Sequence, residues 1–221
     1  MFKWLKRSDG LEDVEKGFLG MLRDGRRVFD LAMQARLSGV VTDSPVNELN
    51  RLEERTDETE RRIRRQVLVH ASVHGATDIT ACLMYMSVTK DAERISDLSK
   101  NLFGVARTVK TAPPEDLRLE LEELYVQISA MIEDAALVFE ADDLEGARAW
   151  IEKARGVMDR CHARIEDLLT TTDVRPQAAA SVLTYRHLGR ITAHALNAVS
   201  AVVMPLDQLD YPSEALDEGR P

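Results

Sequence analysis

The chain has 221 residues, of which 44% are hydrophobic, 30% charged and only 5% aromatic, and this balance favours helices in one large or two small domains. Its formal net charge of -9 argues against nucleic-acid binding, which requires a basic surface, and is compatible with cation binding. The sequence contains no apolar run of about eighteen residues, so it predicts no membrane-spanning helix.

Two smaller features bear on where the protein works. The basic start, Met1 to Arg7, lacks the apolar core and cleavage site of a secretory signal. We interpret it as a frayed or docked terminus rather than a contact with a membrane surface or a transporter. Cys82 and Cys161 lie far apart, without metal-ligand spacing, which is typical of buried free thiols in a reducing compartment. We therefore expect a cytoplasmic protein.

Apolar residues at helical spacing predict six helices and no strand. In chain order, the first two expected helices cover residues 11–37 and 45–72. The third carries an apolar stripe at 81–105, and the last three cover 115–140, 144–169 and 177–203. Ser44 and Pro45 have the types expected at the N-cap and first position of the second helix. Thr77 or Asp78 is expected to cap the third helix after a turn at Gly75.

The two halves of the chain resemble each other, with a boundary at Pro113 and Pro114, because a pair of prolines cannot continue a helix. Three segments align in the same order, namely 21–30 with 131–140, 57–63 with 159–165 and 94–101 with 190–197. Such ordered matches indicate a tandem repeat. We therefore predict an all-α fold of two tandem antiparallel three-helix bundles, residues 1–112 and 113–221, with an acidic tail at the end of the second.

Four carboxylates form two pairs of the same spacing, Glu53 with Asp57 and Glu93 with Asp97. On a helix this spacing stacks both side chains on one face, where like charges repel unless a cation lies over them. Each pair is centred about 20 residues from Gly75, or roughly 30 Å of helix. A hairpin at Gly75 would therefore bring the pairs to the same height, on the surface of the bundle and away from the apolar stripe. The plain alternative is a solvated helix face with weak salt bridges.

The stretch from Asp91 to Asn101, which reads DAERISDLSKN, resembles the D-x-E-R-I-x-D-x-x-x-N signature of PhoU proteins. These are bacterial regulators of phosphate uptake and phosphate signalling. The resemblance implies two three-helix bundles and a site for a transition metal ion, such as iron or manganese. The ligands it implies are Glu53, Asp57, Glu93 and Asp97. It also implies a phosphate transporter and, in some cases, a sensor histidine kinase as partners, with membrane association only through such a partner. A homodimer is an assembly that the sequence leaves open.

The second half departs from this signature. Three of the four carboxylates are replaced there, and only Asp159 survives. The replacements are Arg155, Gly189 and Ala193. Because a hard or borderline cation loses its anionic ligands at these positions, the resemblance carries metal binding over to the first half alone.

Histidines offer rival sets of ligands. His70 and His74 have the i, i+4 spacing that suits zinc. His187 and His194 lie on one face of the sixth predicted helix, where His162 from the fifth can approach them. No Glu-x-x-His motif of a di-iron centre accompanies these residues. We therefore interpret them as ordinary helix or turn histidines.

The sequence has no Gly-rich phosphate loop and no nucleophile elbow, so we expect a regulator rather than an enzyme. Two alternatives stay open. One is a metal-dependent phosphoester hydrolase that uses the same carboxylates, and the other is a helical adaptor without metal. Metal analysis of the purified protein separates the adaptor from the other two, and a phosphatase screen separates the hydrolase from the regulator.

Overall fold

The computed structural model describes residues 10–170 and 176–209. Over these residues the chain forms six α-helices, two short 3-10 helices and no strand, which confirms the all-α prediction. The α-helices are α1 (Glu12–Ser38), α2 (Asp43–His74), α3 (Ile79–Val109), α4 (Glu115–Ala141), α5 (Leu144–Thr170) and α6 (Pro176–Val203). The 3-10 helices are η1 (Gly75–Thr77) and η2 (Leu206–Gln208). The interpretations of the basic start, of the break at 171–175 and of the acidic tail lie outside the described residues.

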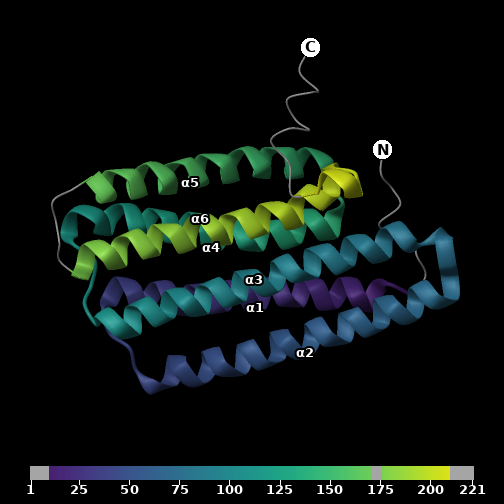
Figure 1. Ribbon diagram of the computed structural model, residues 1–221, viewed down its shortest axis with the longest axis horizontal. Helices are drawn as coiled ribbons and strands as arrows, with labels where there is room; N and C mark the ends of the chain where they lie inside the picture. Colours follow the sequence, from purple (N-terminus) through teal and green to yellow (C-terminus); the bar gives the residue numbers. More distant parts are fainter. Residues whose placement is uncertain (1–9, 171–175, 210–221) are drawn as a thin grey trace, which may run out of the picture.

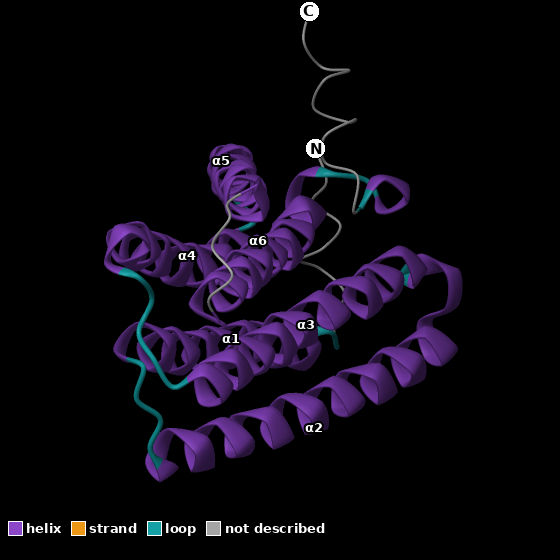
Figure 2. Cartoon of the chain, turned by 60° about the vertical axis from the view of Figure 1, so that its left-hand side comes forward, coloured by secondary structure: helices purple, strands orange, loops and turns teal. Residues whose placement is uncertain are grey.

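The helices form two layers that run along the long axis of the molecule (Figure 1). One antiparallel bundle consists of α1, α2 and α3 and the other of α4, α5 and α6, as predicted. In each bundle one helix lies on the outside, α2 in the first and α5 in the second (Figure 2). Contacts between the bundles join α3 to α6 and α1 to α4. The predicted carboxylate ligands therefore lie on an outer helix and on the inner helix beside it.

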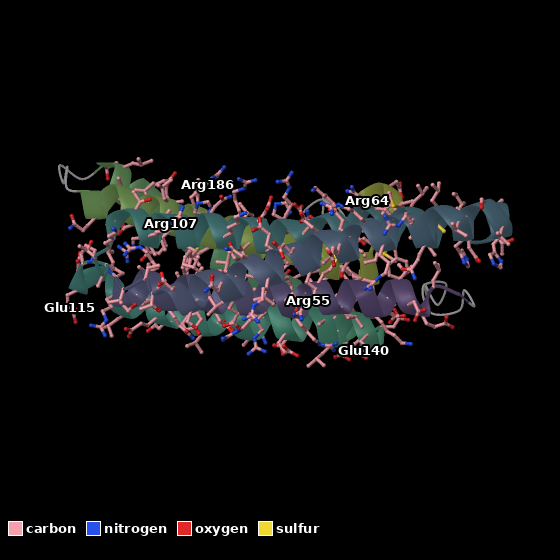
Figure 3. All side chains as sticks on the ribbon, turned by 90° about the horizontal axis from the view of Figure 1, so that it is seen from below. Arg55, Arg64, Arg107, Glu115, Glu140 and Arg186 are labelled. Atoms are coloured by element: carbon pink, nitrogen blue, oxygen red, sulfur yellow. The ribbon has the colours of Figure 1, made fainter. Side chains whose placement is uncertain are left out.

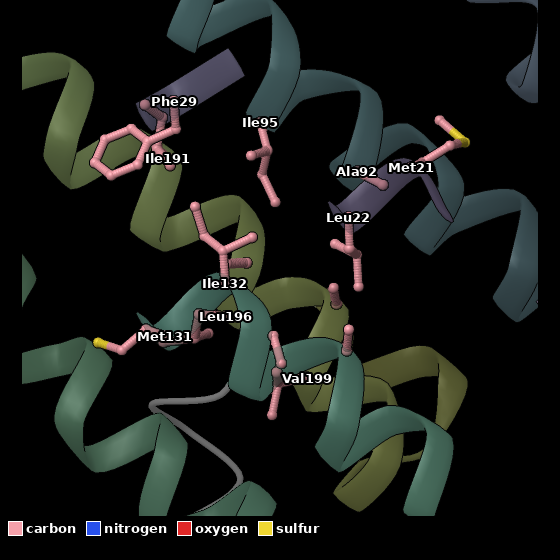
Figure 4. Close-up of a cluster of buried hydrophobic side chains, with 14 of the residues drawn as sticks. Met21, Leu22, Phe29, Ala92, Ile95, Met131, Ile132, Ile191, Leu196 and Val199 are labelled. Carbon is pink, nitrogen blue, oxygen red and sulfur yellow. The ribbon is translucent and has the colours of Figure 1, made fainter. Parts of the chain in front are cut away.

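A single hydrophobic cluster extends through both bundles. Its members come mainly from the inner helices and are almost completely buried. Figure 4 shows among them Leu22, Ile95, Ile132, Ile191 and Val199. Because burial of apolar surface contributes about 25 cal/mol per Å², this shared core couples the stability of one bundle to that of the other.

The turn between α1 and α2 depends on Gly39. This residue has φ 68°, in the left-handed region that glycine adopts readily, and its N–H donates to the carbonyl of Ala35 to end α1. A Cβ atom at Gly39 would lie 2.4 Å from the backbone nitrogen of Ala112. The segment that leads into α4 thus passes directly over this turn.

The start of α2 differs from the prediction. The helix begins at Asp43 with Thr42 as its N-cap residue, so the predicted N-cap at Ser44 is wrong. Pro45 lies within the first turn, where a backbone N–H has no partner inside the helix to lose. A proline there is compatible with a start two residues earlier than its own position.

Both cysteines are free and buried, as predicted. Burial raises the pKa of the Cys161 thiol to about 12. Burial also raises the pKa of the Cys82 thiol, and the negative charge of Asp78 raises it further. Neither thiol is therefore a ready thiolate ligand at neutral pH.

Candidate metal-binding sites

Two stretches of the α2–α3 hairpin face each other. The ammonium group of Lys100 on α3 contacts the carboxylate of Glu53 on α2. Closer to the turn, Lys90 Nζ lies 3.8 Å from Glu60 Oε1. These two contacts bracket the intervening residues of both helices, and they place the two predicted carboxylate pairs on opposing turns of the hairpin.

Glu93 lies deeper than the sequence suggested. Its exposed fraction is 9%, whereas the position off the apolar stripe led us to expect a surface residue. Its carboxylate lies 2.6 Å from Lys90 Nζ and 3.7 Å from Arg94 Nε. Burial raises the pKa of Glu93, and the charge of Asp97 raises it further, while the hydrogen bond from Lys90 opposes both. The difference arises because α2 covers this face of α3, which a stripe on one helix does not reveal.

The other three predicted ligands are partly exposed, and each has a cationic neighbour. The contacts are Glu53 with Lys100, Asp57 with Arg61 at 3.4 Å, and Asp97 with Arg94 at 3.2 Å. Within the described part of the chain, the four carboxylates do not form a group in which three potential ligand atoms lie within 4.8 Å of one another. Their present partners are thus lysine and arginine side chains of the same hairpin.

Sequence reasoning missed Glu60, which is a buried member of this face. Its Oε1 lies 2.6 Å from Arg64 Nη2, and it faces Lys90 across the hairpin. Figure 3 labels Arg64 among the charged side chains that project from the molecule. The spacing of Glu60 would have revealed it, because it follows Glu53 by seven residues and therefore lies on the same helix face.

The hairpin carries a second group of potential ligands at its turn, formed by His70, His74 and Asp78. Their ligand atoms all lie within 4.8 Å of one another, which no other group of three does among the residues that the structure describes. His70 is buried, and its Nε2 lies 2.9 Å from an oxygen of Asp78. The two imidazole rings stack with their centroids 4.2 Å apart.

The sequence alone favours ordinary helix or turn histidines at His70 and His74, and it offers Thr77 or Asp78 as the cap of α3. Asp78 does occupy the N-cap position of α3, but its side chain makes no capping hydrogen bond and turns to His70 instead. The pairing across the turn could not be read from one helix, although the short separation of Asp78 from His74 was a signal.

The other histidines do not come together. His194 Nδ1 lies 2.8 Å from Asp91 on α3, so it belongs to a polar contact between the bundles. His162 is exposed and lies 3.2 Å from Glu166 on its own helix. Burial lowers the pKa of His187, which keeps this imidazole neutral.

In the second bundle, the region that corresponds to the carboxylate site is a groove of about 320 Å³ between α5 and α6. Its lining includes Asp159, Gly189 and Ala193, together with Arg186 and Arg190. One carboxylate beside two guanidinium groups is a poor ligand set for a cation.

None of the described helices is long and apolar enough to cross a membrane.

Comparisons with known proteins agree with this architecture. Residues 18–104 match the family model of the PhoU domain. The structure is similar to the crystal structure of PhoU from Pseudomonas aeruginosa, with a TM-score of 0.77 and 19% identity over 88% of this chain and 95% of that chain. It is also similar to the phosphate transport system regulatory protein PhoU from Streptococcus pneumoniae, with a TM-score of 0.74 and 15% identity over 91% of this chain and 95% of that one. No curated protein sequence matches the chain.

The family model covers the greater part of the first bundle and includes all four predicted ligands and the signature of α3. The structural matches extend the likeness in fold to both bundles. The resemblance read from the α3 signature is confirmed, because residues 18–104 match the PhoU domain and the chain has the fold of the two PhoU structures.

Proposed function

We propose that this chain is a non-enzymatic regulator of phosphate transport that acts through protein contacts and binds a multivalent cation at the α2–α3 carboxylates. The observation that carries the proposal is the PhoU-domain match over residues 18–104, which contains both carboxylate pairs. The name of the related Streptococcus pneumoniae protein, a phosphate transport system regulatory protein, supports the same role. The protein works in the cytoplasm, reaches the membrane only through a partner, and does not bind nucleic acid.

The proposed cation ligands are Glu53, Asp57, Glu93 and Asp97. Glu93 supports a cation site most directly, because burial makes its ionised form unfavourable unless positive charge lies close by. Lysine and arginine side chains supply that charge in the structure. A transition metal ion such as manganese or iron would displace these flexible side chains, and an all-oxygen ligand set suits it better than it suits a thiolate-seeking metal.

A helical adaptor without metal is the second candidate, and one observation favours it. Each of the four carboxylates already has a cationic neighbour, so the hairpin is partly neutralised by its own side chains. The three partly exposed pairs, at Glu53, Asp57 and Asp97, contribute only about 0–1 kcal/mol each. The two candidates therefore differ in whether the purified protein takes up a divalent cation, not in whether it folds.

Protein contacts need an exposed apolar surface, and the α2–α3 hairpin offers one near its turn. Val69 and Val73 lie one helical turn apart on α2 and are 63% and 72% exposed. Ile79 and Leu83 lie one turn apart at the start of α3 and are 42% and 49% exposed. Apolar side chains grouped in this way mark interaction surfaces. We place the contact with a phosphate transporter, or with a sensor histidine kinase, at this surface.

The test is recovery of partners from membranes of cells that contain a phosphate transporter. The Val69→Ser, Val73→Ser double variant should recover several-fold less transporter or kinase than the parent chain. The matched control is Leu119→Ser with Val126→Ser, which changes two exposed apolar residues of α4. Phosphate uptake should change when the chain is deleted and return when it is restored. Unchanged uptake, or equal recovery by both double variants, would contradict the proposal.

The metal-dependent phosphoester hydrolase is tested separately. The purified chain is assayed with a chromogenic phosphate monoester in the presence of manganese or magnesium. We expect no turnover above that of the free metal ion. Turnover that Asp97→Ala abolishes would favour the hydrolase instead.

A further inference from the structure

We propose that His70, His74 and Asp78 form a transition-metal site at the turn of the α2–α3 hairpin, with imidazole and carboxylate ligands suited to zinc. The site is separate from the carboxylates along the hairpin, because Glu60 precedes His70 by ten residues, or about 15 Å of helix. The proposal does not depend on the function proposed above.

The local fold brings these three side chains together. His70 and His74 lie one turn apart at the end of α2, where i and i+4 positions share a face. The chain then reverses through η1, with Gly75 at φ 58°. This reversal returns Asp78, the N-cap residue of α3, to the side of His70. A ligand set is thus built from two helix ends and the short turn between them.

Asp78 provides the first sign of a ligand role. An aspartate at an N-cap ordinarily accepts a hydrogen bond from its own helix, which is worth about 1 kcal/mol. The carboxylate of Asp78 makes no such bond and lies 2.9 Å from His70 Nε2. An imidazole nitrogen and a carboxylate held this close are ligands that a divalent ion can bridge in place of a proton.

The surroundings of His70 select its coordinating nitrogen. A Cβ atom built at Gly10 would lie 3.3 Å from His70 Nδ1, so the backbone at the start of the first bundle covers that edge of the ring. Nε2 is the nitrogen that faces Asp78. We therefore assign Nε2 of His70, a ring nitrogen of His74 and a carboxylate oxygen of Asp78 as the three ligands.

Burial and helix charge both favour a cation at this place. The side chains of His70 and Asp78 are only 6% and 19% exposed, which fixes two ligands, whereas His74 is exposed and its ring can rotate onto the metal. The C-terminal end of α2 also carries the negative end of the helix dipole, which stabilises positive charge. Three protein ligands leave the fourth position of a tetrahedral zinc ion open to water or to a partner's side chain.

The ligand types separate this site from the carboxylate site. Imidazole with one carboxylate suits zinc, cobalt or nickel, whereas four carboxylates suit manganese or magnesium. Zinc at the turn would join the end of α2 to the start of α3 next to the exposed apolar surface described above. The ion would thereby rigidify the part of the hairpin that carries this surface.

The experiment measures zinc affinity of the untagged full-length chain by competition with a chromogenic chelator, and coordination by the visible absorption of the cobalt form. The parent should bind zinc and give a cobalt spectrum typical of four-coordinate, nitrogen-ligated metal. His74→Ala and Asp78→Asn should each weaken zinc binding by about tenfold or more, the scale expected when metal-site groups are lost.

Two controls distinguish a built site from surface histidine. His162→Ala removes an exposed histidine that has a carboxylate partner on its own helix, and it should leave zinc affinity unchanged. Asp159→Ala changes an aspartate in the groove of the second bundle, outside both proposed metal sites, and should also leave it unchanged. Circular dichroism of His74→Ala should match that of the parent, because this side chain is exposed. No zinc uptake by the parent, or an equal loss in His74→Ala and His162→Ala, would overturn the proposal.

Discussion

At the scale of the residue, the buried carboxylate of Glu93 explains why the hairpin requires positive charge at this position. Its carboxylate lies in the α2–α3 interface beside Lys90, and burial is the main reason that its pKa is raised. A carboxyl group that is harder to ionise in the folded state opposes folding once it is charged. The contribution of Glu93 to stability is therefore fully present below the pKa that this carboxyl group has in the unfolded chain, near the ordinary value of 4.5. It is lost as the pH rises through the raised pKa of the folded state.

This sign predicts the behaviour of Glu93→Gln in metal-free buffer. At pH 7 the variant should be more stable than the parent to urea, and the difference should vanish near pH 4, where both states of the parent are protonated. Added manganese should stabilise the parent and not the variant, because a bound ion favours the ionised ligand set. A less stable variant at pH 7 without metal would mean that the Lys90 ion pair outweighs burial.

Glu48 is a control of opposite sign. Its pKa is lowered, chiefly by the hydrogen bond from Arg27, whose Nε lies 2.7 Å away. The contribution of Glu48 to stability is therefore present above its pKa in the unfolded chain and is lost as the pH falls through its lowered pKa in the folded state. Glu48→Gln should be less stable than the parent at pH 7, and this difference should shrink in acid.

At the scale of the element, the sequence predicted the helices well and the contacts between them poorly. The helices followed from apolar spacing and from the glycine and proline breaks between them, because that spacing records which face of a helix is buried and those residues end helices. The start of α2 was missed by two positions, since Pro45 is acceptable anywhere in a first turn. The burial of Glu93 and the turning of Asp78 to His70 could not be predicted, because both depend on a second helix.

The end of α1 gives a prediction for a single glycine. Gly39→Ala should destabilise the protein by about 1–3 kcal/mol, because alanine must adopt a positive φ and its Cβ would lie within 2.4 Å of Ala112. Gly20→Ala is the matched control inside α1. A Cβ there meets no atom within 4 Å, so helix propensity alone should stabilise the protein by about 0.5–1 kcal/mol. Urea unfolding measures both, and equal effects in the two variants would contradict this account of the turn.

At the scale of the whole molecule, the two bundles share one hydrophobic cluster. The proposed boundary at Pro113 and Pro114 therefore divides the chain in sequence and not in its core. The repeat was visible in the sequence, but the packing of α3 on α6 was not, because the apolar stripe of an inner helix does not say which neighbour covers it. We expect the molecule to unfold as one cooperative unit.

Ile95→Ala tests this coupling. Ile95 is fully buried in α3, and its truncation should destabilise the protein by about 2–5 kcal/mol. Calorimetry should show a single transition that moves as a whole, while Leu119→Ala, at an exposed position of α4, should stay within about 0.5 kcal/mol of the parent. Two transitions, of which only one moves, would show that the bundles unfold independently.

The central claim is that a cation binds the first-bundle carboxylates and not their counterparts in the second bundle. The most direct measurement is the manganese and iron content of the parent, Asp97→Ala and Asp159→Ala, purified from metal-replete medium and again after manganese is added. The account predicts metal in the parent and in Asp159→Ala, and its loss from Asp97→Ala with little change in thermal stability of the metal-free protein. Equal loss from both variants, or a parent that takes up no manganese or iron, would contradict it.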